Sequence, residues 1–222
     1  MNETLMIAGR HFQLLGDGQG PVFLMGVFKD EAGEKTVSET KARTAKPFTL
    51  VTFDTADWDN DFSPWAAPGM EENRPFGGGG PETLRMLRNE AMPLLKERFG
   101  EMPVITAGYS LSGLFALWAL YECEAFAGAV CCSGSLWVQG FMEYVQKKGL
   151  QAGQSVYLSL GGKEEKTTHP IVCTIGDCTR QMDRILKADA AAPRHTLEWN
   201  SGGHFADSAK RLAKGLAWML EK

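Results

Sequence analysis

Short apolar runs recur along the sequence, and in its second half longer helical patterns separate them. The runs have the length of strands, are rich in Val, Ile, Phe and Tyr, and cover residues 22–28, 48–53, 104–107, 126–132, 155–160 and 195–199. Turn-like segments separate the first runs, so we expect the sheet to begin antiparallel. Strands that alternate with helices predict an α/β fold, in which a mostly parallel central sheet carries helices on both faces.

Apolar residues at helical spacing mark the segments between these runs. The predicted helices cover residues 81–99, 111–122, 138–147, 171–188 and 206–220. The segment 111–122 is apolar almost all round, which is typical of a buried helix. Pro93 lies inside the first segment and is expected to kink its helix.

The composition is that of an ordinary globular domain. The chain has 222 residues without an internal repeat or a long linker, so we expect a single domain over residues 1–222. Hydrophobic residues make up 44% and charged residues 23%, which excludes a disordered chain. The formal net charge of −4 offers no basic surface, so we expect no nucleic-acid partner.

The apolar segments are too short to indicate export or a membrane anchor. The first residues include an early acid and no signal-like apolar stretch, and no run approaches the roughly 20 residues of a membrane helix. The cysteine count of 5 is odd, and Cys131 and Cys132 are adjacent in an apolar run, where core packing is their simplest role. We therefore expect a cytoplasmic protein with no membrane partner.

The residues that could form a metal or phosphate site have the wrong spacing. Asp57, Asp59 and Asp61 alternate but lack the glycine and glutamate of an EF-hand loop. The glycines of residues 77–80 lack the Lys-Ser or Lys-Thr of a phosphate-binding loop, and we expect a flexible loop there. Neither a metal ion nor another cofactor is expected.

The segment GYSLS, residues 108–112, lies between an apolar run and the buried helix pattern. Small residues two positions before and after a serine are typical of a nucleophile elbow, a tight turn that exposes the serine hydroxyl. Gly108 fills the first position and Ser112 the second. Such a turn would point Ser110 into a cleft above the sheet. It would also place the Leu111 amide at a helix N-terminus, where it can serve as half of an oxyanion hole.

A serine hydroxyl needs a base to become a nucleophile, and the sequence contains four histidines. In elbow hydrolases the chain order is serine, acid, histidine, with the histidine on a late loop. Only His204, in SGGHF between the last predicted strand and the last predicted helix, fits that order well. His204 is therefore the candidate base.

The base needs a carboxylate partner, which should follow the penultimate predicted strand. The sequence there, LGGKEEK, offers Glu164 and Glu165. Glu164 is favoured because it lies three residues after the first glycine of a turn, with Glu165 as the open alternative. Asp177 and Asp183 fall inside a helical pattern and are weaker candidates.

These motifs together resemble a known family. In their order along the chain, AGYSLSGLFALWA, CSGSLW, LSLGGKEE and SGGHF resemble the small esterase-D and enterochelin-esterase-like members of the α/β-hydrolase superfamily, as does DWDNDFSPW. The resemblance runs from about Pro21 to the C-terminus. It implies an α/β-hydrolase fold with Ser110 as nucleophile, His204 as base and Glu164 as acid. It also implies a second oxyanion amide in the loop after the third strand, near Trp58.

Tryptophans in two of the predicted loops could contact a substrate. Trp58, Trp65 and Trp137 are candidates for an apolar wall beside an acyl or aryl group, and packing beneath the loops is an equal alternative. The interval 133–154 must hold a loop, a helix and a turn, so no large cap domain is expected. We therefore expect a shallow, open cleft bordered by residues 57–68, residues 77–80 and Trp137.

The combined prediction is a serine hydrolase that cleaves carboxylic esters of small molecules through an acyl-enzyme on Ser110. Two alternatives remain open. An acyltransferase would use the same acyl-enzyme with an alcohol acceptor, and a non-catalytic binding module would keep only the fold. The sequence indicates neither the natural ester nor the oligomeric state.

Overall fold

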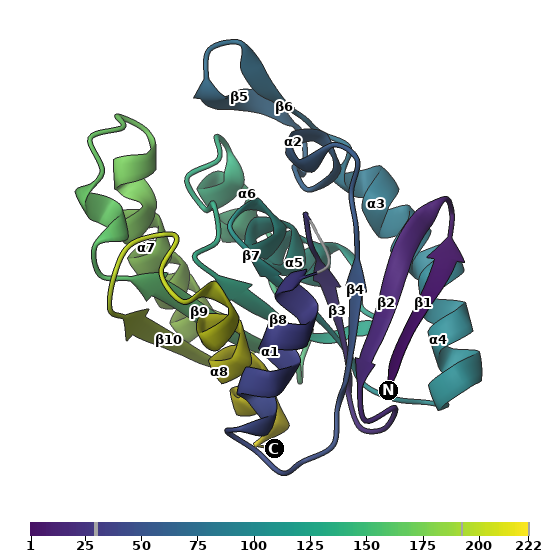
Figure 1. Cartoon of the computed structure of the whole chain (residues 1–222). Coiled ribbons are helices and arrows are strands. Elements are labelled where there is room, and N and C mark those ends of the chain that lie inside the picture. The colour runs from purple at the N-terminus through teal and green to yellow at the C-terminus, as the bar shows by residue number, and fades with distance from the viewer. Residues whose placement is uncertain (29–30, 192, 222) are drawn as a thin grey trace.

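An eight-stranded sheet forms the centre of the structure, a computed structural model that describes residues 1–28, 31–191 and 193–221 (Figure 1). The strand order across the sheet is β1-β2-β4-β3-β7-β8-β9-β10. The strands are β1 (Asn2–Ile7), β2 (Arg10–Gly16), β3 (Val22–Gly26), β4 (Thr49–Phe53), β7 (Val104–Tyr109), β8 (Phe126–Cys132), β9 (Ser155–Gly161) and β10 (Arg194–Asn200). From β4 to β10 every neighbouring pair is parallel, as the alternating pattern predicts.

The antiparallel start of the sheet is not where the sequence predicted it. It is made by β1, β2 and β4, whereas β3 and β4, the first two predicted runs, pair in parallel. Helix α1 (Glu31–Lys41) supplies the crossover between them. The sequence pattern misses α1 because its buried face consists of Gly33, Thr36, Val37 and Thr40 rather than of large apolar residues. Gly33 lets the helix lie close to the sheet, since a Cβ there would lie 2.7 Å from a Leu15 methyl carbon.

Helices cover both faces of the sheet (Figure 1). Helices α1 and α8 (Ser208–Leu220) lie on one face, and α3 (Gly80–Met86), α4 (Met92–Phe99), α5 (Leu111–Glu122), α6 (Phe141–Lys147) and α7 (Ile175–Ala188) on the other. Side chains alternate along each strand, so Phe23 and Met25 pack towards α8 while Val22 and Leu24 pack towards α5. The sheet is therefore buried on both sides, as an α/β fold requires.

The helix predicted over residues 81–99 is interrupted ahead of Pro93. A π-helical turn, η1 (Leu87–Ala91), separates α3 from α4. Pro93 has no N–H to donate to the preceding turn. Prolines and π-helical turns are both common sites of helix distortion. The expected distortion therefore occurs as a π turn.

A two-stranded hairpin stands apart from the main sheet. Strands β5 (Ala66–Glu71) and β6 (Arg74–Gly77) pair with each other, and Figure 1 places them beyond the carboxyl end of β4, beside the short helix α2 (Trp58–Asp61). The sequence analysis expected loops over residues 57–68 and 77–80 and did not predict these two strands, which lack alternating apolar residues. Only Phe76 is a buried large side chain there. Among the described residues, no helix is both long and apolar enough to cross a membrane.

Candidate active site

The turn between β7 and α5 has the strained geometry of a nucleophile elbow. Ser110 has φ 61° and ψ −126°, a conformation that L-residues rarely adopt. Gly108 permits it, because a Cβ at that position would lie 2.2 Å from the Ser112 carbonyl oxygen. Ser112 is fully buried, and its hydroxyl donates to the Gly26 carbonyl at 2.8 Å, tying α5 to β3. The turn presents the Ser110 side chain at the carboxyl end of the sheet.

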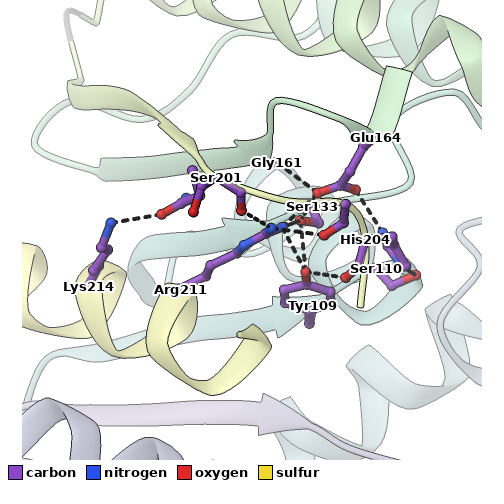
Figure 2. Close-up of polar contacts among 11 residues, drawn as sticks. Tyr109, Ser110, Ser133, Gly161, Glu164, Ser201, His204, Arg211 and Lys214 are labelled. Atoms are coloured by element: carbon purple, nitrogen blue, oxygen red, sulfur yellow. Dashed lines mark hydrogen bonds and ion pairs between the residues drawn. The ribbon is translucent and has the colours of Figure 1, made fainter. Parts of the chain in front are cut away.

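The three residues expected to form a triad lie together in the structure (Figure 2). The Ser110 hydroxyl oxygen is 3.1 Å from His204 Nε2. On the other side of the ring, His204 Nδ1 is 2.8 Å from Glu164 Oε2. The His204 side chain is one-third exposed, whereas the Glu164 side chain is buried. This arrangement lets the imidazole accept the serine proton at one nitrogen while the carboxylate faces the other.

Glu164 follows β9 in a short 3₁₀ turn, η2 (Glu164–Lys166), and its second oxygen is also held. The Gly161 N–H donates to Glu164 Oε1 at 2.7 Å, three residues back along the turn. The Ser133 hydroxyl donates to the same oxygen at 2.7 Å. Burial raises the pKa of Glu164, but hydrogen bonds from His204, Ser133 and the Gly161 amide outweigh it and leave the pKa below its usual value. The carboxylate is therefore charged at neutral pH.

Glu165, the alternative acid, points elsewhere. Its two carboxylate oxygens accept from Arg180 at 2.8 and 2.9 Å, which directs the side chain towards α7. The structure places Glu164, and not Glu165, against the imidazole.

The fold should lose stability when Glu164 becomes glutamine, and the loss should shrink at acid pH. Because the folded-state pKa of Glu164 is lowered, the stability that its charge contributes is fully present above about pH 4.5 and is lost as pH falls through the folded-state pKa. At neutral pH the variant also breaks the buried ion pair of Glu164 with Arg211, at a cost of about 3 kcal/mol. Urea unfolding of both proteins from about pH 7 to pH 3 measures the difference between their free energies of unfolding. If the difference between the two free energies of unfolding grows as the pH falls, this linkage is contradicted.

The loop that carries His204 is joined to the acid turn by main-chain hydrogen bonds. The Gly162 N–H donates to the Asn200 carbonyl at 2.8 Å, and the Lys163 N–H donates to the Gly202 carbonyl at 3.0 Å. Gly202 has φ 87°, in the region that favours glycine. The Tyr109 hydroxyl donates to the His204 carbonyl at 2.5 Å, and burial raises the pKa of Tyr109 to about 12. The base and the acid are therefore positioned by one connected set of loops.

Tyr109, Ser133 and Arg211 belong to this site, but the sequence analysis did not assign them. Tyr109 precedes the nucleophile in the elbow motif, and Ser133 begins the SGSLW loop, so both stood next to residues already singled out. Arg211 lies in the last predicted helix beside other charged residues such as Lys210 and Lys214, so no signal in the sequence set it apart. In the structure its side chain is buried and contacts Glu164.

A cavity of about 530 Å³ opens beside Ser110. Its apolar lining comes from the hairpin, the loop after β8, a short 3₁₀ turn ahead of α7 and the first residue of α7; the residues are Met70, Phe76, Trp137, Val172 and Ile175. Trp58 also lines it, as does Phe205, which is 97% exposed. The hairpin thus forms a wall that the sequence analysis did not anticipate, and no cap domain is present in the described residues.

One of the three candidate tryptophans and one of the three expected borders do not line this cavity. The Trp65 ring packs against Tyr144 with centroids 5.5 Å apart, and its Nε1–H donates to the Gln139 carbonyl at 2.8 Å. Packing beneath the loops, the open alternative for the tryptophans, therefore describes Trp65. Residues 77–80 contribute no lining residue, because Gly77 and Gly79 pack closely on Asn60.

The two expected oxyanion amides have different positions. Leu111 begins α5 and lines the cavity next to Ser110. Trp58 begins α2, which follows β4. The strand order places β3, rather than β4, next to β7. The segment that follows β3 therefore also lies beside the elbow, although the Val27 N–H itself donates to the Phe53 carbonyl at 2.9 Å.

The acidic loop after β4 binds protein groups. Asp57 accepts from the Asn60 N–H at 3.1 Å and caps α2. Asp59 pairs with Arg74, and Asp61 with Arg10. In the part of the chain that the structure describes, no three His, Cys, Asp or Glu side chains gather as a metal site would require.

Comparisons with known proteins point to one enzyme class. A family model described as "Putative esterase" matches residues 12–206. A search of the curated proteins found no significant match. Among solved structures, the chain resembles an IroE-like serine hydrolase from Shewanella oneidensis with a TM-score of 0.83 and 14% identity, over 99% of this chain and 80% of that one.

Two other solved structures share the fold. The siderophore hydrolase EstB from Aspergillus nidulans has a TM-score of 0.71 and 14% identity, over 99% of this chain and 94% of that one. The enterobactin esterase FES from Shigella flexneri has a TM-score of 0.72 and 17% identity, over 98% of this chain and 59% of that one. At these identities the likeness is one of fold.

Proposed function

Because the chain belongs to the family described as "Putative esterase" and is a carboxylic ester hydrolase, we propose that it works through an acyl-enzyme formed on Ser110. The observation that carries this proposal is the line of contacts from the Ser110 hydroxyl through His204 to Glu164. Nucleophile, base and acid stand in that geometry in hydrolases on unrelated folds.

The acylation step uses each of these groups once. The Ser110 hydroxyl oxygen attacks the ester carbonyl carbon while His204 Nε2 takes the hydroxyl proton. The Glu164 carboxylate faces the imidazolium that forms and stabilises its charge. The carbonyl oxygen becomes an oxyanion, for which we propose the Leu111 N–H as one donor, with Trp58 or the segment after β3 supplying the second.

The intermediate collapses when the bond to the leaving alcohol breaks and His204 returns the proton to the alcohol oxygen. Water then enters the same position. His204 takes a proton from the water, the hydroxide attacks the acyl carbonyl, and Ser110 leaves with the proton that His204 returns. The products are the free acid and the resting enzyme, and no cofactor takes part.

The cavity supports esters of compact acids as substrates. A volume of about 530 Å³ lies in the range of small-molecule sites, and its lining is mainly apolar. Phe76 and Trp137, whose ring centroids are 5.9 Å apart, offer a surface for an acyl or aryl group. Because two of the structural neighbours are an enterobactin esterase and a siderophore hydrolase, siderophore esters belong in the substrate panel.

A fluorophosphonate probe tests the proposed function. The probe should label Ser110, and the labelled site can be read by mass spectrometry of the digested protein. The enzyme is tested on a panel of short acyl, aryl, sugar and macrolactone esters. The fraction of hydrolytic activity that is lost should equal the fraction of the protein that is labelled. A protein that neither takes the label nor turns over any ester would be a binding module. Ester products formed from added alcohol in preference to free acid would indicate an acyltransferase.

Among p-nitrophenyl esters, kcat/KM is expected to be highest for short or compact acyl groups and to fall for long chains. Without a cap domain, the methylene groups beyond the cavity stay in water. Each exposed methylene then forgoes roughly 0.8 kcal/mol of binding. The measurement is kcat/KM against acyl length below micelle-forming concentrations. A steady rise towards long chains, or activation on emulsions, would show that the cavity binds more chain than its volume indicates.

A further inference from the structure

Arg211 projects from α8 into the centre of the site and is 1% exposed (Figure 2). One terminal nitrogen of its guanidinium, Nη1, donates to Glu164 Oε1 at 2.7 Å. The same nitrogen lies 3.0 Å from the hydroxyl oxygens of Tyr109 and Ser133. This half of the guanidinium therefore contacts the proposed acid and the residue that precedes the proposed nucleophile.

The other terminal nitrogen contacts the loop of the base. Nη2 of Arg211 donates to the Ser201 carbonyl at 3.0 Å and to the Gly203 carbonyl at 2.9 Å. Gly203 directly precedes His204, so a single planar group is bonded to both the acid and the chain segment that carries the imidazole.

On the basis of the proposed function, we propose that Arg211 is the positioning residue of the Ser110–His204–Glu164 triad. Its guanidinium holds Glu164 by Oε1, which leaves Oε2 for the imidazole. Its second nitrogen holds the His204 loop at a fixed distance from that carboxylate. Arg211 contacts no reacting atom and acts through these two groups.

Stability alone does not account for this arrangement. The attraction within a buried ion pair is roughly cancelled by the hydration that both charges lose. Proteins with apolar residues in place of such a pair are often no less stable. Within the described residues, Arg211 Nε has no hydrogen-bond partner, and an unpaired buried N–H is a further cost. What the guanidinium supplies is geometry, because its flat, forked donors reach two acceptors at once. A lysine ammonium has the charge without the fork.

The experiment compares Arg211→Met, Arg211→Lys and the control Arg194→Met. Arg194 also anchors α8, since it donates to the Trp218 carbonyl at 3.0 Å and its guanidinium carbon lies 3.7 Å from the Trp218 ring centroid, but it lies at the start of β10, away from the triad. For each variant, kcat, KM and the rate of fluorophosphonate labelling of Ser110 are measured, together with the thermal unfolding midpoint.

We expect Arg211→Met to lower kcat and the labelling rate by about 100-fold, as displaced catalytic groups do, while KM stays within about twofold. Arg211→Lys should recover part of this loss, because it restores the charge but cannot bond both the acid and the loop. Arg194→Met should lower the unfolding midpoint without changing kcat. If both variants lose stability but only Arg211→Met loses kcat, reduced stability cannot account for the lower kcat.

Three outcomes would overturn the inference. Arg211→Met could keep kcat and labelling within about threefold of the wild type, or it could raise KM alone, which would make Arg211 a substrate-binding residue. Arg194→Met could lower kcat equally, which would make the effect one of fold stability. If Arg211→Met does not fold, Arg211→Lys is judged by the same criteria. Failure of the proposed function is distinct, because the wild-type protein would then take no label at Ser110.

Discussion

Replacing Ser110 with alanine is expected to abolish ester turnover, by up to ~10⁶-fold, and to leave the fold intact. The alanine removes the oxygen that lies 3.1 Å from His204 Nε2. Alanine carries the same Cβ as serine, so it meets the same strain at φ 61° and changes the packing little. The measurements are kcat/KM on the best ester, fluorophosphonate labelling and thermal unfolding.

Ser38→Ala is the matched control, because Ser38 lies on the exposed side of α1. It should keep full turnover and full labelling. Labelling of Ser110→Ala at wild-type rate would place the nucleophile at another residue. Lost turnover together with a lost unfolding transition would report a failed fold, and labelling of the wild-type protein at Ser110 would then decide the assignment.

Replacing Glu164 with glutamine should lower kcat by roughly 10³- to 10⁴-fold, while Glu165→Gln should stay within about threefold of the wild type. An amide cannot stabilise the imidazolium as a carboxylate does, and its NH₂ group favours the wrong imidazole tautomer. Glu165→Gln is the matched control, because it makes the same chemical change at the neighbouring residue. The partner of Glu165 is Arg180, on the half-exposed surface of α7.

The pair is compared by kcat/KM on one ester at neutral pH, with unfolding midpoints measured in parallel. Equal, small effects would mean that Ser110 and His204 work as a dyad or that another acid serves them. A larger effect at Glu165 would reverse the assignment of the two carboxylates. Glu164→Asp adds a second measurement, since it keeps the charge but draws the carboxylate back by one methylene from His204.

The proximity of Ser110, Glu164 and His204 could be predicted because each stands in a short loop directly after an apolar run. The carboxyl ends of parallel strands meet at one edge of a sheet, so residues in such loops come together whatever their separation along the chain. The elbow adds a local steric requirement, and Gly108 satisfies it. Both constraints involve residues that are close together in the sequence, so a single sequence is enough to recognise them.

The features that the sequence analysis did not predict have no apolar pattern along the chain. Helix α1 buries Thr36 and Thr40, whose hydroxyls satisfy carbonyls one turn back, so no apolar stripe marks it. The hairpin is held at Gly69, where a Cβ would lie 1.8 Å from the Arg74 carbonyl oxygen, rather than by an apolar pattern. The position of Arg211 follows from how α8 packs, and a charged residue within a helix is more often exposed than buried.

The hairpin of β5 and β6 has a consequence for how this enzyme could acquire new substrates. It supplies Met70 and Phe76 to the cavity but none of the hydrogen bonds that connect Ser110, His204, Glu164 and Arg211. Its strands pair with each other and not with the main sheet. Insertions or exchanges within residues 66–77 therefore change the wall of the cavity without removing any of these hydrogen bonds. The shape of the cavity and the contacts among these four residues can thus be altered separately, by selection as well as by design.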